Sequence, residues 1–260
     1  MTLSMKEIRA EVLESGGKTP LLRVKELSER FPESIALRNK EFGIWNEISY
    51  LDFWNRSTYL ASALMVYGVN KGEKVAVHSE NRPEWFISDL GIQAVGAVTV
   101  GLYPTNPKSE VEYLLGHSET VVLFAEDQEQ VDKALAVQEN LPSLKRIVYF
   151  DKKGMYKYDS EYLISFEEFL EIGKEKLDLN IEQINQTINN IQDDDLALLV
   201  YTSGTTGPPK GSMITHGNLK WVSGNLVTTV FVESVNTKNP QFLSYLPLCH
   251  IFARLTDLSL

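Results

Sequence analysis

The 260-residue chain is 43% hydrophobic, so it can bury a substantial core as one large domain or two small ones. Its 35 acidic residues outnumber its 25 basic ones, and the net charge of -10 argues against a nucleic acid partner and against electrostatic attraction to an anionic bilayer. The single cysteine, Cys249, cannot form an internal disulfide, and no Cys/His group shows metal-ligand spacing, which favours a cytoplasmic protein.

Targeting and membrane signals are weak. Residues 1–19 contain no continuous apolar core of signal-peptide length. No stretch approaches the roughly 20 apolar residues that cross a bilayer, and the nearest, residues 86–103, is interrupted by Asp89 and Gln93. The sequence therefore predicts no transmembrane segment, and it leaves peripheral membrane contact and a homodimer open.

The first expected elements are a hairpin and a helix. Short strand-like runs at residues 35–37 and 45–50 flank the turn-like residues 39–43. Residues 51–67 follow with the apolar periodicity of an amphipathic helix. We expect residues 1–70 to lead, through this hairpin and helix, into a larger domain.

From residue 74 onward, short apolar runs alternate with helical patterns. Such alternation predicts a parallel sheet covered by helices, which we expect to form a first α/β subdomain over residues 71–192. Strands are expected at residues 75–78, 97–102, 121–125 and 146–150, with helices between them at 83–95, 108–117 and 129–139.

The next segment, residues 151–195, is polar and charged, with one expected helix at 166–176, and it indicates a connection between subdomains. A buried strand at residues 196–201 then runs directly into a loop. We expect a helix from about residue 215 and a further strand at 242–246.

The end of the sequence shows no stop signal. Leu260 lies in an apolar run that begins at Ile251, with neither a capping residue nor a glycine after it. We therefore expect residues 193–260 to begin a second subdomain that this sequence does not complete.

The loop after the strand at 196–201 is the candidate site. It is not a Walker A loop, because Pro209 stands where a glycine should precede the lysine, and it is not a dinucleotide-binding turn. Its glycines can turn backbone N–H groups toward an anion, its hydroxyls add donors, and Lys210 adds a mobile positive charge. The other residues concerned are Thr202, Ser203, Gly204, Thr205, Thr206 and Gly207.

Together these groups can hold the β- and γ-phosphates of ATP. Pyrophosphate would then leave from a stabilised position when the α-phosphorus is attacked. The alternative is an ordinary solvated turn rich in serine, threonine and glycine.

Residues 201–218, with the sequence YTSGTTGPPKGSMITHGN, resemble the signature loop of the adenylate-forming superfamily of acyl-CoA synthetases, luciferases and peptide-synthetase adenylation domains. Further segments are similar, in order and spacing, to its long-chain acyl-CoA synthetase branch. They are NRPEW at residues 81–85, GAV at 96–98, LYPT at 102–105, VEYLLGHSE at 111–119 and LPLCHIF at 246–252. The resemblance extends from about Ala36 to the last residue.

The resemblance implies a doubly wound α/β large domain, with sheets flanked by helices and two similar subdomains. Residues 193–260 would begin the second, ATP-binding subdomain, and this sequence would be the amino-terminal part of the enzyme. The implied enzyme is an AMP-forming acyl-CoA synthetase whose substrates are ATP, a carboxylic acid such as a long-chain fatty acid, and CoA. With Mg2+ it would form acyl-AMP and pyrophosphate, and then acyl-CoA and AMP.

The resemblance also implies roles for single residues. Thr202 would lie near Mg2+, Lys210 would assist the polyphosphate, and residues 203–207 would cradle the phosphates. His250 would lie beside the reacting carboxylate, with Phe252 lining the same region; the alternatives are a core histidine and simple core packing. The thiol of Cys249 is expected to be a buried filler, because CoA brings its own thiol.

Two positions depart from the family pattern. Ala253 followed by Arg254 stands where the branch commonly has glutamate, which bears on the charge pairing near His250, and Ser212 stands where a small apolar residue is usual. The family's adenine-contacting segment, Mg2+-binding glutamate, ribose-binding aspartate and lid lysine have no match in this sequence. The piece alone is therefore not expected to complete a turnover.

Rival interpretations remain open at this point. One is an adenylation module of a carboxylic acid reductase or of a peptide synthetase, which would share the same loop. The other is a non-catalytic nucleotide-binding fragment.

Overall fold

A seven-stranded sheet forms the centre of the computed structural model, which describes residues 18–202, 207–229 and 241–257. The strands of the sheet are β3 (Lys74–His78), β4 (Val98–Leu102), β5 (Thr120–Ala125), β6 (Arg146–Tyr149), β7 (Leu163–Ser165), β8 (Leu196–Thr202) and β9 (Lys210–Thr215). The helices around it are α2 (Pro20–Arg30), α3 (Tyr50–Val66), α4 (Pro83–Ala94), α5 (Lys108–His117), α6 (Gln128–Leu135), α7 (Phe166–Glu175), α8 (Leu177–Asn189), α9 (His216–Thr229) and α10 (Ile251–Asp257).

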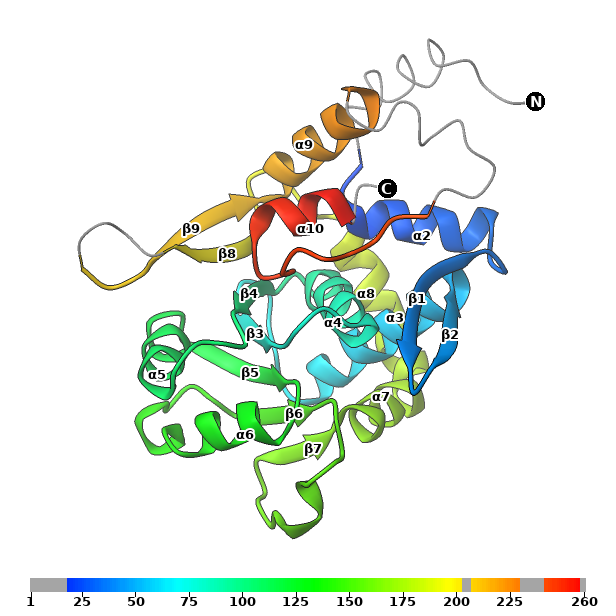
Figure 1. Cartoon of the computed structure of the whole chain (residues 1–260). Coiled ribbons are helices and arrows are strands. Elements are labelled where there is room, and N and C mark those ends of the chain that lie inside the picture. Colours follow the sequence, from blue (N-terminus) through cyan, green and yellow to red (C-terminus); the bar gives the residue numbers. More distant parts are fainter. Residues whose placement is uncertain (1–17, 203–206, 230–240, 258–260) are drawn as a thin grey trace.

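The strand order is β7-β6-β5-β3-β4-β8-β9 (Figure 1). Every neighbouring pair from β7 to β8 is parallel, and β9 joins β8 antiparallel. Helices cover both faces of the sheet, as the doubly wound α/β expectation requires. The expected fold class is therefore confirmed.

The two faces have separate cores. Helices α5 and α6 pack on one face, against side chains such as Val100 and Leu123. Helices α3, α4, α7 and α8 pack on the other, against side chains such as Val77 and Phe124. Because strand side chains alternate between two covered faces, the strands are continuous apolar runs, and every residue of β5 is buried.

The expected hairpin is confirmed at β1 (Ile35–Glu41) and β2 (Ile44–Ser49), which pair antiparallel. The turn between them consists of Phe42 and Gly43, whose φ angles of 47° and 85° are both positive. Positive φ at both central residues is the geometry of a type I′ turn, which suits the twist of the flanking strands. The Ser49 hydroxyl then caps α3, which matches the expected helix.

The polar segment before β8 contains more structure than its composition indicates. The expected helix is present as α7, where Ser165 and Glu168 form a capping box. Strand β7 and helix α8 were not predicted from the sequence. In α8 only Ile184 and Ile188 are buried, one turn apart, so its apolar signal is too sparse to stand out among asparagines and glutamines.

Two differences occur beyond β8. The strand expected at residues 242–246 is wrong, because residues 241–245 form no strand in the structure. Strand β9, which the sequence did not predict, follows the candidate loop. The apolar run at Phe242, Leu243 and Tyr245 suggested a strand, yet these side chains are exposed and the segment belongs to neither of the described sheets.

The pairing of β8 with β4 decides where the candidate loop lies. Residues Thr99, Val100 and Gly101 of β4 pair in parallel with Leu198, Leu199 and Val200 of β8. The start of residues 193–260 is thus in the same sheet as the strands of residues 71–192, and the division into subdomains stays a prediction. Among the described helices, none has the length and apolar character needed to cross a membrane.

The contact between α3 and α7 gives a test of the packing. A Cβ atom on Gly173 would overlap the Tyr59 carbonyl of α3, whereas one on Gly116 of α5 would meet only Leu141 Cδ2 at 3.6 Å. We expect Gly173→Ala to destabilise the protein by about 1–3 kcal/mol through overpacking. Urea denaturation of the purified protein measures this change.

Gly116→Ala is the matched control for that substitution. It should be neutral or stabilising by up to about 1 kcal/mol, because alanine restricts the unfolded chain without a clash. Equal effects of the two substitutions would contradict the proposed packing of α7 on α3.

Candidate functional site

The candidate loop connects β8 to β9. In the antiparallel register of these strands, Thr202 at the end of β8 is paired with Lys210 at the start of β9. Directly paired residues of antiparallel strands have Cα atoms about 4.5–5.5 Å apart, so the hydroxyl and the ammonium group share the mouth of the loop. Both side chains are exposed.

Gly207 is the other described member of the predicted phosphate loop. Its φ of 84° lies in the left-handed region, and among the described residues no atom beyond its chain neighbours lies within 4 Å of the position that a Cβ would occupy. Ser203, Gly204, Thr205 and Thr206 lie outside the described residues. Within the described residues, the Lys210 ammonium group forms no salt bridge.

The segment that contains His250 crosses the sheet at β4. A Cβ atom built on Gly101 would come within 2.8 Å of the Cys249 Cα atom, so glycine is needed for this close approach. Gly101 is paired with Val200, which precedes Thr202 by two positions in β8. His250 and the candidate loop therefore lie at the same edge of the sheet, where its parallel strands end.

Asn81 holds this segment in place. Its side-chain amide donates to the Ser244 hydroxyl at 2.9 Å and to the Leu246 carbonyl at 2.7 Å. Its carbonyl oxygen accepts from the Leu248 N–H group at 2.9 Å. One asparagine side chain thus bonds this segment at three points and holds it against the turn that follows β3.

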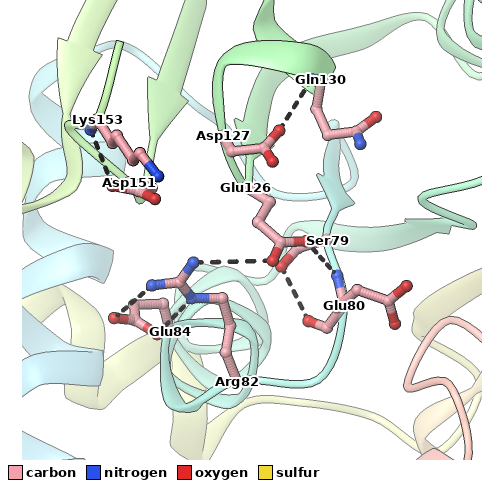
Figure 2. Close-up of polar contacts among 9 residues, drawn as sticks. All are labelled: Ser79, Glu80, Arg82, Glu84, Glu126, Asp127, Gln130, Asp151 and Lys153. Carbon is pink, nitrogen blue, oxygen red and sulfur yellow. Dashed lines mark hydrogen bonds and ion pairs between the residues drawn. The ribbon is translucent and has the colours of Figure 1, made fainter. Parts of the chain in front are cut away.

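Charged side chains form a network at the turn that follows β3 (Figure 2). Asn81 lies in this turn, between Glu80 and Arg82. Arg82 donates to Glu84 at 2.8 Å and lies 4.0 Å from Glu126, which also accepts from the Glu80 N–H group at 2.7 Å. Burial opposes the charge of Arg82, but Glu84, Glu126 and Asp151 offset it and raise the pKa of the guanidinium.

This network occupies the point where β3 and β5 end side by side. The chain leaves β3 toward α4 on one face of the sheet and leaves β5 toward α6 on the other (Figure 1). Such a topological switch point commonly forms a ligand crevice in open α/β sheets. Here the ion pairs of Arg82 lie at this point, and the neighbouring Asn81 bonds the segment that leads to His250.

His250 is exposed and directly precedes α10. Its Nδ1 accepts a hydrogen bond from the Phe252 N–H group at 3.2 Å. The neutral ring therefore carries its proton on Nε2, which has no hydrogen-bond partner among the described residues and can donate to a ligand. The core alternatives for His250 and Phe252 are wrong, since His250 is exposed and Phe252 is 54% exposed.

Arg254 anchors α10 in the interior. Its side chain is 2% exposed and forms a two-point ion pair with Asp89 of α4, which is fully buried, with an Nε–Oδ2 distance of 2.9 Å. Thr99 and Gln93 donate to the same carboxylate, and the guanidinium lies 4.8 Å from the centre of the Trp85 ring. The positive charge of Arg254 in α10 is therefore paired with the carboxylate of Asp89 in α4.

The described residues offer few side chains that could bind a metal ion. Among the described residues, no group of three or more His, Cys, Asp or Glu side chains could hold a metal ion. Thr202 offers one exposed hydroxyl, whereas Mg2+ prefers six oxygen ligands, several of them water or phosphate. The described residues fit a Mg2+ ion that arrives bound to phosphates.

Cys249 is a buried filler, as the sequence predicted. It is 3% exposed, and burial raises the pKa of its thiol to about 12. A thiol in this state is neutral and shielded, so it is unsuited to act as a nucleophile.

Sequence reasoning assigned no role to Asn81, Asp89 or Arg254. The resemblance singled out the segment at residues 81–85, which contains Asn81, and marked Arg254 as a departure from the family pattern, but it indicated no contact of either residue. Asp89 and Arg254 are 165 positions apart, and no sequence pattern indicates that they touch. Their pairing appears only when α4 and α10 pack together.

Comparisons with known proteins identify the fold and the family of the chain. Solved adenylate-forming enzymes share the fold, among them the acetoacetyl-CoA synthetase from Streptomyces lividans, with a TM-score of 0.73 and 17% identity over 93% of this chain and 37% of that chain. A putative long-chain-fatty-acid CoA ligase from Rhodopseudomonas palustris has a TM-score of 0.71 and 20% identity over 94% of this chain and 55% of that chain. At these identities the likeness establishes the fold.

The family model described as AMP-binding enzyme matches residues 24–260, so the chain belongs to that family. Curated relatives include the long-chain-fatty-acid–CoA ligase ACSBG2 of Xenopus laevis, 32% identical over 90% of this chain and 31% of the relative, and that of Homo sapiens, 32% identical over 90% and 34%. The human ACSBG1 ligase is 30% identical over 90% and 32%. The chain thus spans about a third of the length of these relatives.

The buried ion pair gives a first test of the site. Arg254→Met should destabilise the protein by about 3–5 kcal/mol, because it leaves the Asp89 carboxylate buried without its partner. Arg38→Met is the control, since Arg38 pairs with Glu47 on the surface and exposed pairs contribute about 1 kcal/mol or less. Urea denaturation that gives similar losses for both variants would contradict the buried pair.

The rate at which Cys249 reacts with a thiol reagent tests whether the Asn81 hydrogen bonds hold the segment closed. Cys249 should label slowly with a thiol reagent at about pH 8 in the folded protein and quickly in urea, because the thiol is buried with a raised pKa. Asn81→Ala should speed labelling about tenfold through loss of the hydrogen bonds that hold the segment closed.

Asn140→Ala is the control for the labelling experiment. Asn140 bonds Glu112 on the surface, so its loss should leave the labelling rate unchanged. If Asn81→Ala labels no faster than Asn140→Ala, the Asn81 side chain does not hold the segment.

Proposed function

We propose that the complete protein uses ATP to activate a carboxylic acid, in the first instance a long-chain fatty acid, and transfers the acyl group to CoA. One observation supports this most directly. The β8–β9 hairpin places Thr202 and Lys210 opposite each other at the ends of a hydroxyl- and glycine-rich loop, in a chain of the AMP-binding enzyme family. The long-chain-fatty-acid–CoA ligases among its relatives support the choice of acid.

In the first proposed step, a carboxylate oxygen attacks the α-phosphorus of ATP. A bond forms between that oxygen and the α-phosphorus, the bond from the α-phosphorus to the bridging oxygen breaks, and pyrophosphate leaves with the electron pair. Lys210 stabilises the charge that develops on the leaving phosphates, together with the hydroxyl and N–H donors of Thr202, Gly207 and residues 203–206. His250 orients the carboxylate by donating from Nε2.

In the second proposed step, the sulfur of CoA attacks the acyl carbon of acyl-AMP. A C–S bond forms, the bond from carbon to the AMP oxygen breaks, and the thiol proton leaves to solvent. No residue of this chain serves as a covalent nucleophile, which agrees with the buried and neutral state of Cys249.

Mg2+ would enter with ATP and neutralise phosphate charge, with Thr202 as the protein ligand in this part of the chain. We also propose that residues 71–192 and 193–260 belong to two subdomains, the second being the ATP-binding one. The pairing of β4 with β8 would then be the seam between them.

Pyrophosphate release by the full-length protein tests this function. We expect release with ATP, Mg2+ and long-chain fatty acids, and acyl-CoA formation only when CoA is added. Adenylate formation without transfer to CoA would support an adenylation module of a reductase or a peptide synthetase instead. No ATP affinity and no adenylate with any acid of a panel of medium-chain, long-chain and aryl acids would refute the proposal.

Lys210→Ala tests the role of the loop. In the full-length protein it should lower ATP-dependent acyl-CoA formation by about 100-fold or more, the usual effect of removing one group that stabilises developing charge. Lys174→Ala is the control, because Lys174 is exposed on α7 and pairs with Glu171 away from the loop. An unchanged rate for Lys210→Ala would remove Lys210 from the mechanism.

A further inference from the structure

Helix α5 contacts both ends of the candidate loop. At the first end, His117 Nδ1 shares a hydrogen bond of 2.7 Å with the hydroxyl of Tyr201, the residue before Thr202. At the second end, the Tyr113 hydroxyl donates to the carbonyl of Pro209 at 3.0 Å. These two contacts join residues 84 and 96 positions apart, so they are tertiary contacts between α5 and the hairpin.

The two α5 side chains form one unit. Tyr113 and His117 are four positions apart and therefore lie on the same face of the helix. Their rings stack at 5.4 Å between centroids with an interplanar angle of 29°, and His117 meets the Tyr201 ring edge-on at 5.7 Å and 81°. Restraining either ring restrains the other, because each packs against its neighbour.

Strand β9 packs against the ring of Tyr201, which belongs to the same aromatic cluster. A Cβ atom on Gly211 would lie 3.3 Å from Cζ of Tyr201, so the glycine after Lys210 lets the strand lie directly on this ring. The backbone on both sides of Lys210 is thus held: Pro209 by the Tyr113 hydroxyl and Gly211 by the Tyr201 ring.

The Tyr113 hydrogen bond acts on a particular peptide unit. The Pro209 carbonyl and the Lys210 nitrogen belong to one planar peptide group. A hydrogen bond that fixes the direction of this carbonyl therefore also fixes the orientation of the peptide group that precedes the Lys210 Cα atom. Pro209 has no N–H group of its own, so its carbonyl is the only polar backbone group through which this residue can be held.

We propose that Tyr113 is a positioning residue for Lys210. Its hydroxyl sets the orientation of the Pro209–Lys210 peptide, and thereby the direction in which the Lys210 ammonium group meets the phosphates of ATP. The inference rests on the proposed function of the loop. It adds Tyr113, a residue of α5 between β4 and β5, and assigns it no contact with phosphate.

Tyr113→Phe in the full-length protein tests the proposal. The substitution removes only the hydroxyl and keeps the ring that stacks on His117. We expect the KM for ATP to rise about 3- to 10-fold, the effect of one neutral hydrogen bond. The KM for the acid and the thermal midpoint should stay near their original values, because neither the acid side of the site nor the core is changed.

Tyr158→Phe is the matched control. The Tyr158 hydroxyl also makes hydrogen bonds, to Asp132 and from Gln128, but it lies on the surface beside α6. The Tyr158→Phe substitution should leave the KM for ATP unchanged. An equal rise for both variants, or a rise in the KM for the acid alone, would overturn the role of Tyr113.

The double variant Tyr113→Phe/Lys210→Ala separates positioning from general damage. If Tyr113 acts through Lys210, the double variant should be no worse than Lys210→Ala alone, because the group being positioned is already absent. Independent, multiplying losses would overturn the proposal.

The two proposals fail in different ways. Normal activity of Lys210→Ala would refute the role of the loop, and the Tyr113 inference with it. A large loss in Lys210→Ala together with an unchanged KM for ATP in Tyr113→Phe would refute only the positioning role.

Discussion

The parallel pairing of β4 with β8 is the contact on which the candidate site depends. It is short, running from Thr99 to Gly101 on one strand and from Leu198 to Val200 on the other. Because parallel strands end at the same edge, it brings the loop after β8 to the edge where β3, β4 and β5 also end. Gly101 within this pairing leaves room for the backbone at Cys249, which places His250 at that edge.

The two halves of the candidate site are held from opposite faces of the sheet. On the face covered by α5, Tyr113 and His117 bond the ends of the loop. On the other face, Asn81 and the Arg254–Asp89 pair hold the segment and the helix between which His250 lies. The loop and the His250 segment are therefore both held against the same sheet. The groups proposed to contact ATP and the acid lie beyond the edge of that sheet.

The anchors differ in physical character. Asn81 works by geometry, because its planar amide offers donors to Ser244 and Leu246 and an acceptor to Leu248 within one segment. The Arg254–Asp89 pair works by burial: two charges removed from water hold each other strongly, and Thr99 and Gln93 satisfy further lone pairs of the carboxylate. A pair of this kind favours one position of α10 over others, because any displacement leaves a charge buried and unpaired.

The sequence by itself determined the class of fold and supplied the prediction that the loop at residues 202–210 binds phosphates. Continuous apolar runs alternating with helical patterns are typical of a parallel sheet covered on both faces, and hydroxyls, glycines and a lysine in this order suit an anion. Strand β9, helix α8 and the course of residues 241–245 were not predictable, because their local patterns are sparse or misleading. The contacts of Asn81, Asp89 and Tyr113 were decided only by the tertiary structure, since each joins segments more than 90 positions apart through packing that no local pattern encodes.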